Sequence, residues 1–288
     1  MKIYRKIIKP LIKRSVRKLK QYGLYLVEDY ISKSRGSEFV FKFNLIARIS
    51  ASPARVRICS DKYIFSDLEL PSKSIFSVHE KQSQMAYKYG FKFRAESLAE
   101  TYKLKKIKFN HGDIVIDCGA NVGDFKLWFD MNKINIKYIG FEPSPIEFEC
   151  LKENIKDTNN ENTCFNIGLW NKDHELSFYL SSQNADSSFI EPPSYQDILI
   201  IKAKRLDSFI NARIKLLKLE GEGAEPEILE GIGDKLNLID YVAADVGFER
   251  GVYQESTLAQ TTNYLLKRGF EIVEINNDRL CILYENKL

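Results

Sequence analysis

Short apolar runs alternate with helical patterns along residues 106–288 of this 288-residue chain. The runs that predict strands lie at 113–119, 137–143, 162–170, 175–181, 214–223 and 239–247. Apolar residues recur every three or four positions, and so predict helices, at 123–132, 144–156, 225–236 and 257–269. This alternation predicts an α/β domain whose mostly parallel sheet is covered by helices on both faces.

Two more apolar runs, around 270–276 and 280–287, flank the short sequence Asn-Asp-Arg. So short a connection predicts a C-terminal antiparallel hairpin. Before residue 106 the pattern is less regular, with strand-like runs within 56–67 and a mostly helical stretch at 77–104. We therefore interpret residues 21–105 as a cap or lead-in region and residues 106–288 as the main α/β domain.

Residues 1–20 hold nine Lys and Arg and no acid, whereas residues 21–288 hold 34 basic and 39 acidic residues. The apolar residues of 1–20 recur at helical spacing, which predicts a basic amphipathic helix as an N-terminal extension. Two interpretations are equally open: the helix lies on an anionic membrane surface, or it packs on its own domain. Nucleic-acid binding is disfavoured, because no aromatic-basic interleaving follows this segment.

The composition, 44% hydrophobic and 28% charged, is typical of a soluble globular protein. No uninterrupted apolar run is long enough for a membrane-spanning helix. Five scattered cysteines and three histidines disfavour a disulfide framework, a zinc site and a histidine nucleophile. We therefore expect a cytoplasmic protein, with residues 1–20 as a candidate contact with the inner membrane face.

The strand at 113–119 ends on an acid and turns at once through small residues. Asp117 is followed by Gly119, Asn121 and Gly123, and a helix begins near Asp124. Ligands bind outside the carboxyl ends of strands in an open α/β sheet, and glycines let the backbone approach closely. A pyrophosphate favours G-x-G-x-x-G without flanking acids, so NAD is the less favoured cofactor. The carboxylates of Asp117 and Asp124, which bracket this turn, suit a cationic cofactor without phosphate, such as S-adenosylmethionine.

The same sheet edge supplies the other candidate cofactor residues. Glu142 ends the next strand, where a carboxylate accepts both hydroxyls of an adenosine ribose. Asn166 and the backbone of Ile167, after the third strand, are placed to flank the adenine. Lys218 is assigned to the site as the cation that balances the acids around it.

Four blocks together resemble the FkbM-type methyltransferases, a branch of the class I S-adenosylmethionine-dependent fold. These are VIDCGANVGDF, IGFEPSPIEFECLKENI, RLDSFI and LLKLEGEGAEPEILEG, and the resemblance covers about residues 100–285. The family usually has K-[IL]-D-x-E-G-A-E in the last block, where this chain has Glu220 and Gly221. The resemblance implies a doubly wound, Rossmann-like sheet of seven strands and S-adenosylmethionine as cofactor. It also implies methyl transfer, commonly to a hydroxyl of a sugar-containing or polyketide acceptor.

Methyl transfer to a hydroxyl needs alignment of the acceptor and a base for its proton. Candidate bases are Glu220, Glu222 and Glu225 after the fourth parallel strand and Asp245 at the end of the fifth, with Glu249 and Arg250 close behind it. Asp245 is the leading candidate for acceptor contact. Crowded acids raise one another's pKa, which makes a carboxylate more basic. The alternative for Glu222 and Glu225 is that they only begin the next helix. Magnesium held by Glu220 and Asp245 is less favoured than metal-free catalysis.

The polar, proline-bearing segment 181–196 interrupts the alternation, and long loops of this kind often bind substrates. Asp186, Ser187 and Ser188 are therefore candidates for shaping the acceptor site, with a surface connection as the alternative. We predict an S-adenosylmethionine-dependent O-methyltransferase for a glycan, glycolipid or related hydroxylated acceptor, hence polysaccharide modification. The alternatives are a non-catalytic nucleoside-binding module and an NAD-dependent oxidoreductase.

Overall fold

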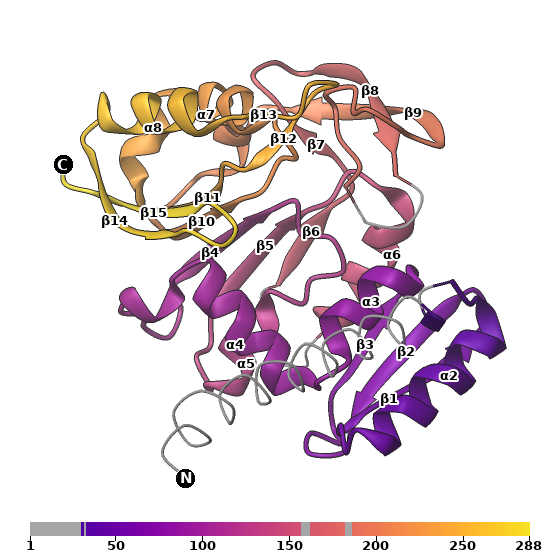
Figure 1. Cartoon of the computed structure of the whole chain (residues 1–288). Coiled ribbons are helices and arrows are strands. Elements are labelled where there is room, and N and C mark those ends of the chain that lie inside the picture. The colour runs from indigo at the N-terminus through magenta and orange to yellow at the C-terminus, as the bar shows by residue number, and fades with distance from the viewer. Residues whose placement is uncertain (1–29, 32, 157–161, 182–185) are drawn as a thin grey trace, which may run out of the picture.

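The computed structural model describes residues 30–31, 33–156, 162–181 and 186–288, and in these residues seven strands form a central sheet (Figure 1). In spatial order the strands are β14 (Phe270–Asn276), β15 (Cys281–Asn286), β11 (Ile239–Asp245), β10 (Ile214–Leu219), β4 (Ile114–Cys118), β5 (Lys137–Phe141) and β6 (Thr163–Phe165). The predicted basic helix at residues 1–20 lies outside the described residues.

The pairing of these strands confirms the predicted fold class. The five strands from β11 to β6 are parallel, whereas β15 runs antiparallel to both β11 and β14. The C-terminal hairpin therefore folds inward, with β15 inserted between β11 and β14. The direction of winding reverses between β4 and β10, and ligands bind at such a reversal in doubly wound sheets.

Helices cover both faces of the sheet because successive strand residues point to opposite sides. Val115 and Leu216 pack toward α4 (Phe91–Thr101), α5 (Lys126–Met131) and α6 (Pro145–Asn154). Ile116 and Leu217 pack toward α7 (Glu225–Ile232), α8 (Leu258–Leu266) and the 3-10 helices η3 (Leu206–Phe209) and η4 (Gly233–Leu238). This two-sided burial explains why the strands are almost continuously apolar in sequence.

The region before the sheet packs into the same core as α4, α5 and α6. It contains α2 (Gly36–Ile49), an antiparallel sheet of β1 (Ala54–Cys59), β2 (Lys62–Asp67) and β3 (Ser74–Ser77), then α3 (Glu80–Tyr87), α4 and the 3-10 turn η2 (Leu104–Lys106). The stretch predicted as mostly helical divides into α3 and α4 at Gly90, whose φ of +89° interrupts a helix. Asn154 of α6 accepts a hydrogen bond from the Phe76 amide of β3 at 2.7 Å, which ties this region to the α/β domain.

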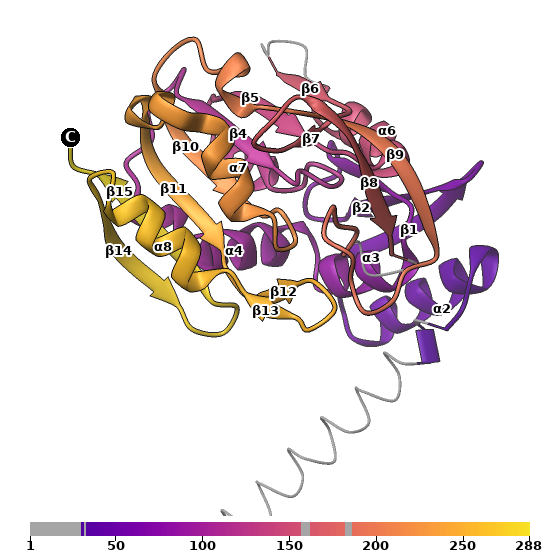
Figure 2. The same cartoon turned by 90° about the horizontal axis from the view of Figure 1, so that it is seen from above.

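A second small sheet lies over the carboxyl edge of the central one (Figure 2). It has the order β7 (Gly168–Leu169), β9 (Asp197–Lys204), β8 (His174–Leu180), and a further hairpin joins β12 (Phe248–Arg250) to β13 (Glu255–Ser256). The strand pattern at 162–170 thus divides between two sheets, and β9 was not predicted. These additions stand beside the site and not within the central alternation.

Candidate active site

A cavity of about 620 Å³ opens at the carboxyl ends of β4, β5 and β10. Seven of the ten predicted site residues line it: Asp117, Gly119, Asn121, Glu142, Lys218, Glu220 and Glu222. Gly123, Asn166 and Asp245 are not among its lining residues. The structure therefore brings most of the predicted site together, with the remaining three in supporting positions.

The turn after β4 depends on backbone conformations that glycine adopts readily. Gly119 has a φ of +69°, and a Cβ there would lie 2.1 Å from the carbonyl oxygen of Glu220. Gly123 has a φ of +80°, and a Cβ there would lie 2.6 Å from Leu151 of α6. Asn121, with a φ of +48°, is a residue type that tolerates this region. The glycines thus permit close contact with the β10 loop and with α6.

Glu142 is ordered by two backbone amides at the end of β5. The amides of Asn121 and Ser144 donate to its two carboxyl oxygens at 2.7 and 2.8 Å. Each oxygen keeps a lone pair, so the carboxylate can still accept two hydroxyls of a diol. Burial, reinforced by the nearby Glu147, raises the pKa of Glu142 to about 8. Asn166 stabilises the backbone after β5 by donating to the carbonyl oxygens of Glu142 and Pro143, both at 2.9 Å.

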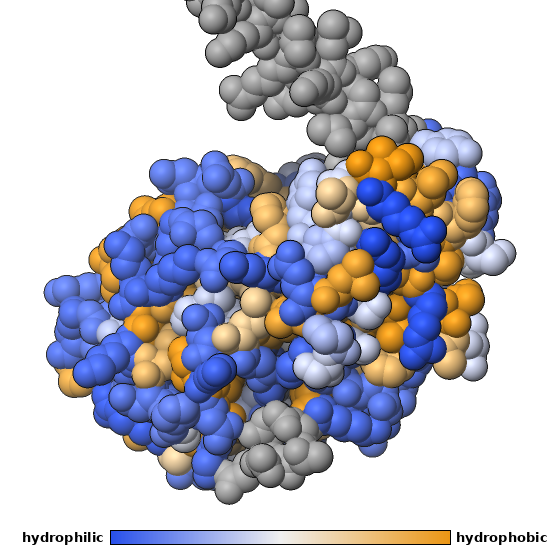
Figure 3. All heavy atoms as spheres, turned by 90° about the horizontal axis from the view of Figure 1, so that it is seen from below, coloured by the Kyte–Doolittle hydropathy of each residue, from blue (hydrophilic) through white to orange (hydrophobic). Residues whose placement is uncertain are grey.

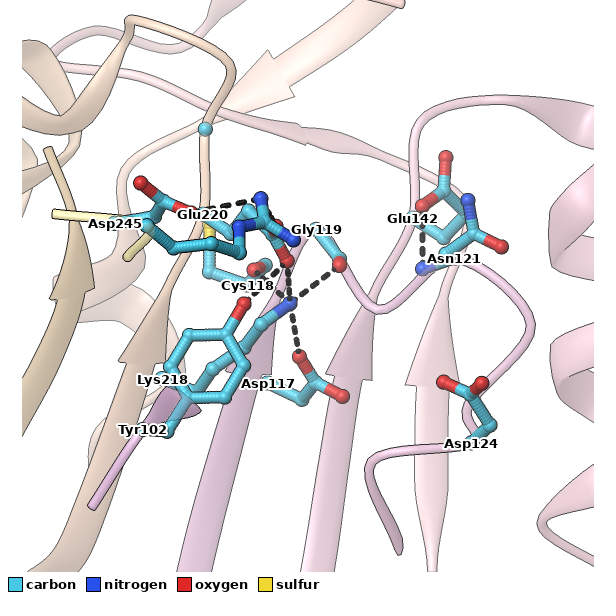
Figure 4. Close-up of polar contacts among 12 residues, drawn as sticks. Tyr102, Asp117, Cys118, Gly119, Asn121, Asp124, Glu142, Lys218, Glu220 and Asp245 are labelled. Atoms are coloured by element: carbon cyan, nitrogen blue, oxygen red, sulfur yellow. Dashed lines mark hydrogen bonds and ion pairs between the residues drawn. The ribbon is translucent and has the colours of Figure 1, made fainter. Parts of the chain in front are cut away.

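Asp117 and Lys218 form a buried ion pair beneath the turn (Figure 4). The Lys218 ammonium lies 3.0 Å from the Asp117 carboxylate, 2.8 Å from Glu220 and 2.7 Å from the carbonyl oxygen of Gly119. Tyr138 donates to the other Asp117 oxygen at 2.5 Å. Burial alone would lower the pKa of Lys218, but the two carboxylates raise it, so the ammonium stays charged. These residues hold the loops after β4 and β10 together; direct cofactor contact by either side chain stays a prediction.

Glu220 is the most strongly compensated acid of the site. Its carboxylate accepts from Tyr102 at 2.8 Å and contacts Arg279 at 3.2 Å, in addition to Lys218. Burial opposes ionisation, but the two cations outweigh it and lower the pKa of Glu220 to about 2. A carboxylate with so low a pKa is a weak base.

Asp245 lies behind Arg279 and not at the cavity surface. It is 1% exposed, its Oδ2 lies 2.8 Å from the Arg279 guanidinium, and its Oδ1 accepts from the Gly247 amide at 3.1 Å. Arg279 itself lines the cavity. Asp245 is thus placed to fix the position of Arg279.

Glu222 and Glu249 face the cavity with raised pKa values. Burial, with Asp245 and Glu220 adding to it, raises the pKa of Glu249 to about 8. Burial and then Glu249 raise the pKa of Glu222 well above its ordinary value. Both carboxyls are therefore better suited than Glu220 to take a proton near neutral pH.

Glu225 closes the loop between β10 and α7. It is 1% exposed and accepts from the amides of Gly221 and Gly223, at 2.7 and 3.2 Å, and from the Thr257 hydroxyl at 2.8 Å. It is also the first residue of α7. Its contacts are therefore those of a residue that shapes the loop.

A second cavity of about 500 Å³ adjoins the first. The two share Asp186, Ser188, Glu222 and Glu249. Ser188 donates to the carbonyl oxygen of Glu222 at 2.8 Å, which fixes the 186–196 loop to the β10 loop. The remaining lining residues are Ser181, Pro192, Pro193, Ser194, Tyr195, Gln196 and Gln254.

Within the described ranges, no group of three or more His, Cys, Asp or Glu is arranged to hold a metal ion. Glu220 and Asp245, considered above as magnesium ligands, both contact Arg279. A guanidinium in that place already compensates the two charges.

Sequence reasoning missed Arg279 and gave Glu249 only a minor place. Arg279 lies in the Asn-Asp-Arg turn of the C-terminal hairpin, far along the chain from the other site residues. It reaches the site because β15 pairs with β11. The strand order of the class I fold would have placed this turn at the carboxyl end of β11.

The sheet order, with its cavity at the carboxyl ends of β4, β5 and β10, defines a doubly wound, Rossmann-like α/β fold with a ligand site at its switch point. The methyltransferase FkbM domain matches residues 117–272, more than half of the chain. The chain therefore belongs to the FkbM methyltransferase family, and its cofactor is S-adenosylmethionine. Both predictions from the sequence are confirmed.

The chain is 24% identical over 190 residues to Methyltransferase 1 of Beauveria bassiana (strain ARSEF 2860), covering 57% of this chain and 74% of that protein. Among solved structures it is similar to M. capricolum TrmK in complex with S-adenosylhomocysteine, at 10% identity, 66% and 68% coverage and a TM-score of 0.39. It is also similar to a SAM-dependent methyltransferase from Aquifex aeolicus, at 12% identity, 68% and 95% coverage and a TM-score of 0.39. Where the chain is described, no helix has the length and apolar character needed to cross a bilayer.

Proposed function

We propose that this methyltransferase transfers a methyl group to a hydroxyl of an uncharged glycan, glycolipid or related polyhydroxylated acceptor. The observation that carries the proposal is the position of Glu222 and Glu249 where the two cavities meet. One cavity has the features of a nucleoside site. The other offers hydroxyls, amides and an aromatic ring to a second ligand.

The residues of the larger cavity fit the cofactor. Glu142 presents two oxygens with free lone pairs to a ribose diol, and the turn at Gly119 brings the backbone close. Asp117 and Glu142 around the turn disfavour a pyrophosphate, and so disfavour NAD. When bound, S-adenosylmethionine supplies a methyl group activated by its sulfonium.

The chain then has to position the acceptor hydroxyl and remove its proton. We assign the proton to Glu249, assisted by Glu222, because carboxyls with raised pKa values are the stronger bases. Such a base contributes about 10²–10⁴-fold to the rate. Asp245, first considered for acceptor contact, becomes a positioning residue for Arg279 in this proposal.

The second cavity favours an uncharged acceptor. None of the described residues that line it is Lys or Arg, whereas Asp186, Glu222 and Glu249 are acidic. Such a wall repels phosphates and therefore disfavours RNA. The rings of Tyr195 and Tyr179 form a T-shaped pair whose centroids are 4.9 Å apart. Tyr195 lines the second cavity and offers an aromatic ring of the kind that stacks on sugars.

Labelling with methyl-tritiated S-adenosylmethionine tests the proposal. The protein would be incubated with neutral oligosaccharides, glycolipids, acidic oligosaccharides and RNA. We expect label in a neutral glycan or glycolipid, released as a methyl ether on hydrolysis. Label in RNA or in a carboxylate ester would contradict the proposal. Binding of S-adenosylhomocysteine without transfer to any pool would favour the non-catalytic module.

A further inference from the structure

The helix α2 is apolar on two opposite faces. Its inner face buries Phe39, Phe43 and Ala47 against the neighbouring sheet. Its outer face carries Phe41 at 68%, Leu45 at 45% and Ile49 at 72% exposure. These three residues are four positions apart and so form one row along the helix. A helix that packs only on its own domain normally has polar residues there.

The apolar row lies in the most basic part of the chain. Residues 1–58 hold 15 Lys and Arg and three acids, whereas residues 59–288 hold 28 and 36. Arg48 is exposed on α2, where Lys42 is ion-paired with Glu38, and Arg57 is exposed on β1. Figure 3 shows hydrophobic side chains interspersed with hydrophilic ones on the side where Figure 1 places α2. An exposed apolar row within a strongly basic region calls for an anionic partner with an apolar interior.

We propose that the outer face of α2 docks on a lipid bilayer with anionic head groups. Phe41, Leu45 and Ile49 would enter the boundary between head groups and acyl chains, while the cations contact the head groups. RNA would satisfy the charge but not the apolar row. A second copy of the chain would satisfy the row but would bring the exposed cations Arg48 and Arg57 of both copies together. The basic, apolar-patterned sequence of residues 1–20 has the same chemistry and precedes α2 in the chain.

The docking surface is near the active site but does not depend on the acceptor proposed above. Lys81, Gln82 and Met85 of α3 line the larger cavity. Both views of the ribbon place α3 close to α2, in the same N-terminal region (Figures 1 and 2).

Vesicle co-sedimentation of the full chain tests the docking surface. The vesicles would be phosphatidylcholine with and without phosphatidylglycerol, at low and high salt. The test variant is Phe41→Ser/Ile49→Ser; the matched control is Ile200→Ser/Tyr253→Ser, which alters residues of 65% and 89% exposure elsewhere. We expect the test variant to bind anionic vesicles at least about tenfold more weakly, because burial of one such side chain is worth that factor or more. The control should bind like the unaltered protein.

Circular dichroism and the Tm of both variants check that they fold, which we expect because the altered side chains are exposed. Weak binding to neutral vesicles and release by salt would support the proposal. Equal binding of the test variant and the unaltered protein would overturn it, as would binding to single-stranded RNA without binding to vesicles. A dimer that the test variant dissociates, with no vesicle binding, would assign the face to a second copy instead.

Discussion

Cofactor affinity should depend on pH through Glu142. The pKa of this carboxyl is raised to about 8 in the folded protein, chiefly by burial. Only the ionised form can accept two ribose hydroxyls while it also accepts the Asn121 and Ser144 amides. Binding must therefore displace a proton whenever the pH is below about 8.

The size of the effect follows from the pKa. Each pH unit below it costs a factor of about ten in the ionised fraction, or about 1.36 kcal/mol. S-adenosylhomocysteine should therefore bind about tenfold more weakly near pH 7 than near pH 9. The free energy of unfolding of the ligand-free protein changes with pH in the opposite direction. Because the folded pKa lies above the ordinary value of 4.5, Glu142 stabilises the fold at low pH and loses that contribution as the pH rises toward 8.

Isothermal titration calorimetry in buffers of different ionisation enthalpy measures both the affinity and the proton released. Glu142→Gln should remove the proton release and weaken binding by about 1.5–3 kcal/mol at high pH, because charge-assisted hydrogen bonds are lost. Glu149→Gln, at an exposed position of the helix α6 that follows, is the matched control and should keep both the affinity and the proton release. Equal affinity near pH 7 and pH 9 in the unaltered protein, with no proton released, would refute the role given to Glu142.

Three further changes test other parts of the site. Lys218→Met should lower the free energy of unfolding in urea by about 3–5 kcal/mol, because it leaves the buried Asp117 and Glu220 without their shared cation. A decrease below about 1 kcal/mol, which is close to the error of such comparisons, would contradict this. Gly119→Ala should lower the Tm and abolish S-adenosylhomocysteine binding, because its Cβ would lie 2.1 Å from the Glu220 carbonyl oxygen; unchanged binding would show that the turn can move. Glu249→Gln should lower single-turnover methyl transfer by about 10²–10⁴-fold and remove a rate increase near pH 8, with cofactor affinity unchanged; an unaltered rate would exclude it as the base.

The sequence predicted the central fold because its strands are buried on both faces and so stand out as apolar runs between amphipathic helices. The strand β9 was missed because Ile198 and Ile200 are largely exposed, so its apolar run neither alternates cleanly nor sits between helices. The helix α2 was missed for a related reason: an apolar row on each side of it obscures the helical period.

The sequence predicted which residues form the candidate site better than it predicted what each of them does. Spacing alone placed Asp117, Glu142 and Glu220 at neighbouring strand ends, where the structure has them. It could not show that Lys218 and Arg279 would compensate particular acids, since this depends on which side chains reach one another across the sheet edge. That is why Asp245 ranked above Glu249 in the sequence, whereas the structure puts Glu249 at the cavity.

The inserted position of β15 has a consequence for biosynthesis. The ribosome makes this strand after all others of the sheet, yet it belongs between β11 and β14. While β15 is still within the exit tunnel, β11 has an unpaired edge and β14 has no neighbour, and Arg279 has not yet joined Asp245 and Glu220. The catalytic pocket is therefore completed last. A nascent chain stalled before residue 279 would expose the unpaired edge of β11, which can aggregate, and would leave Asp245 and Glu220 without the compensating charge of Arg279.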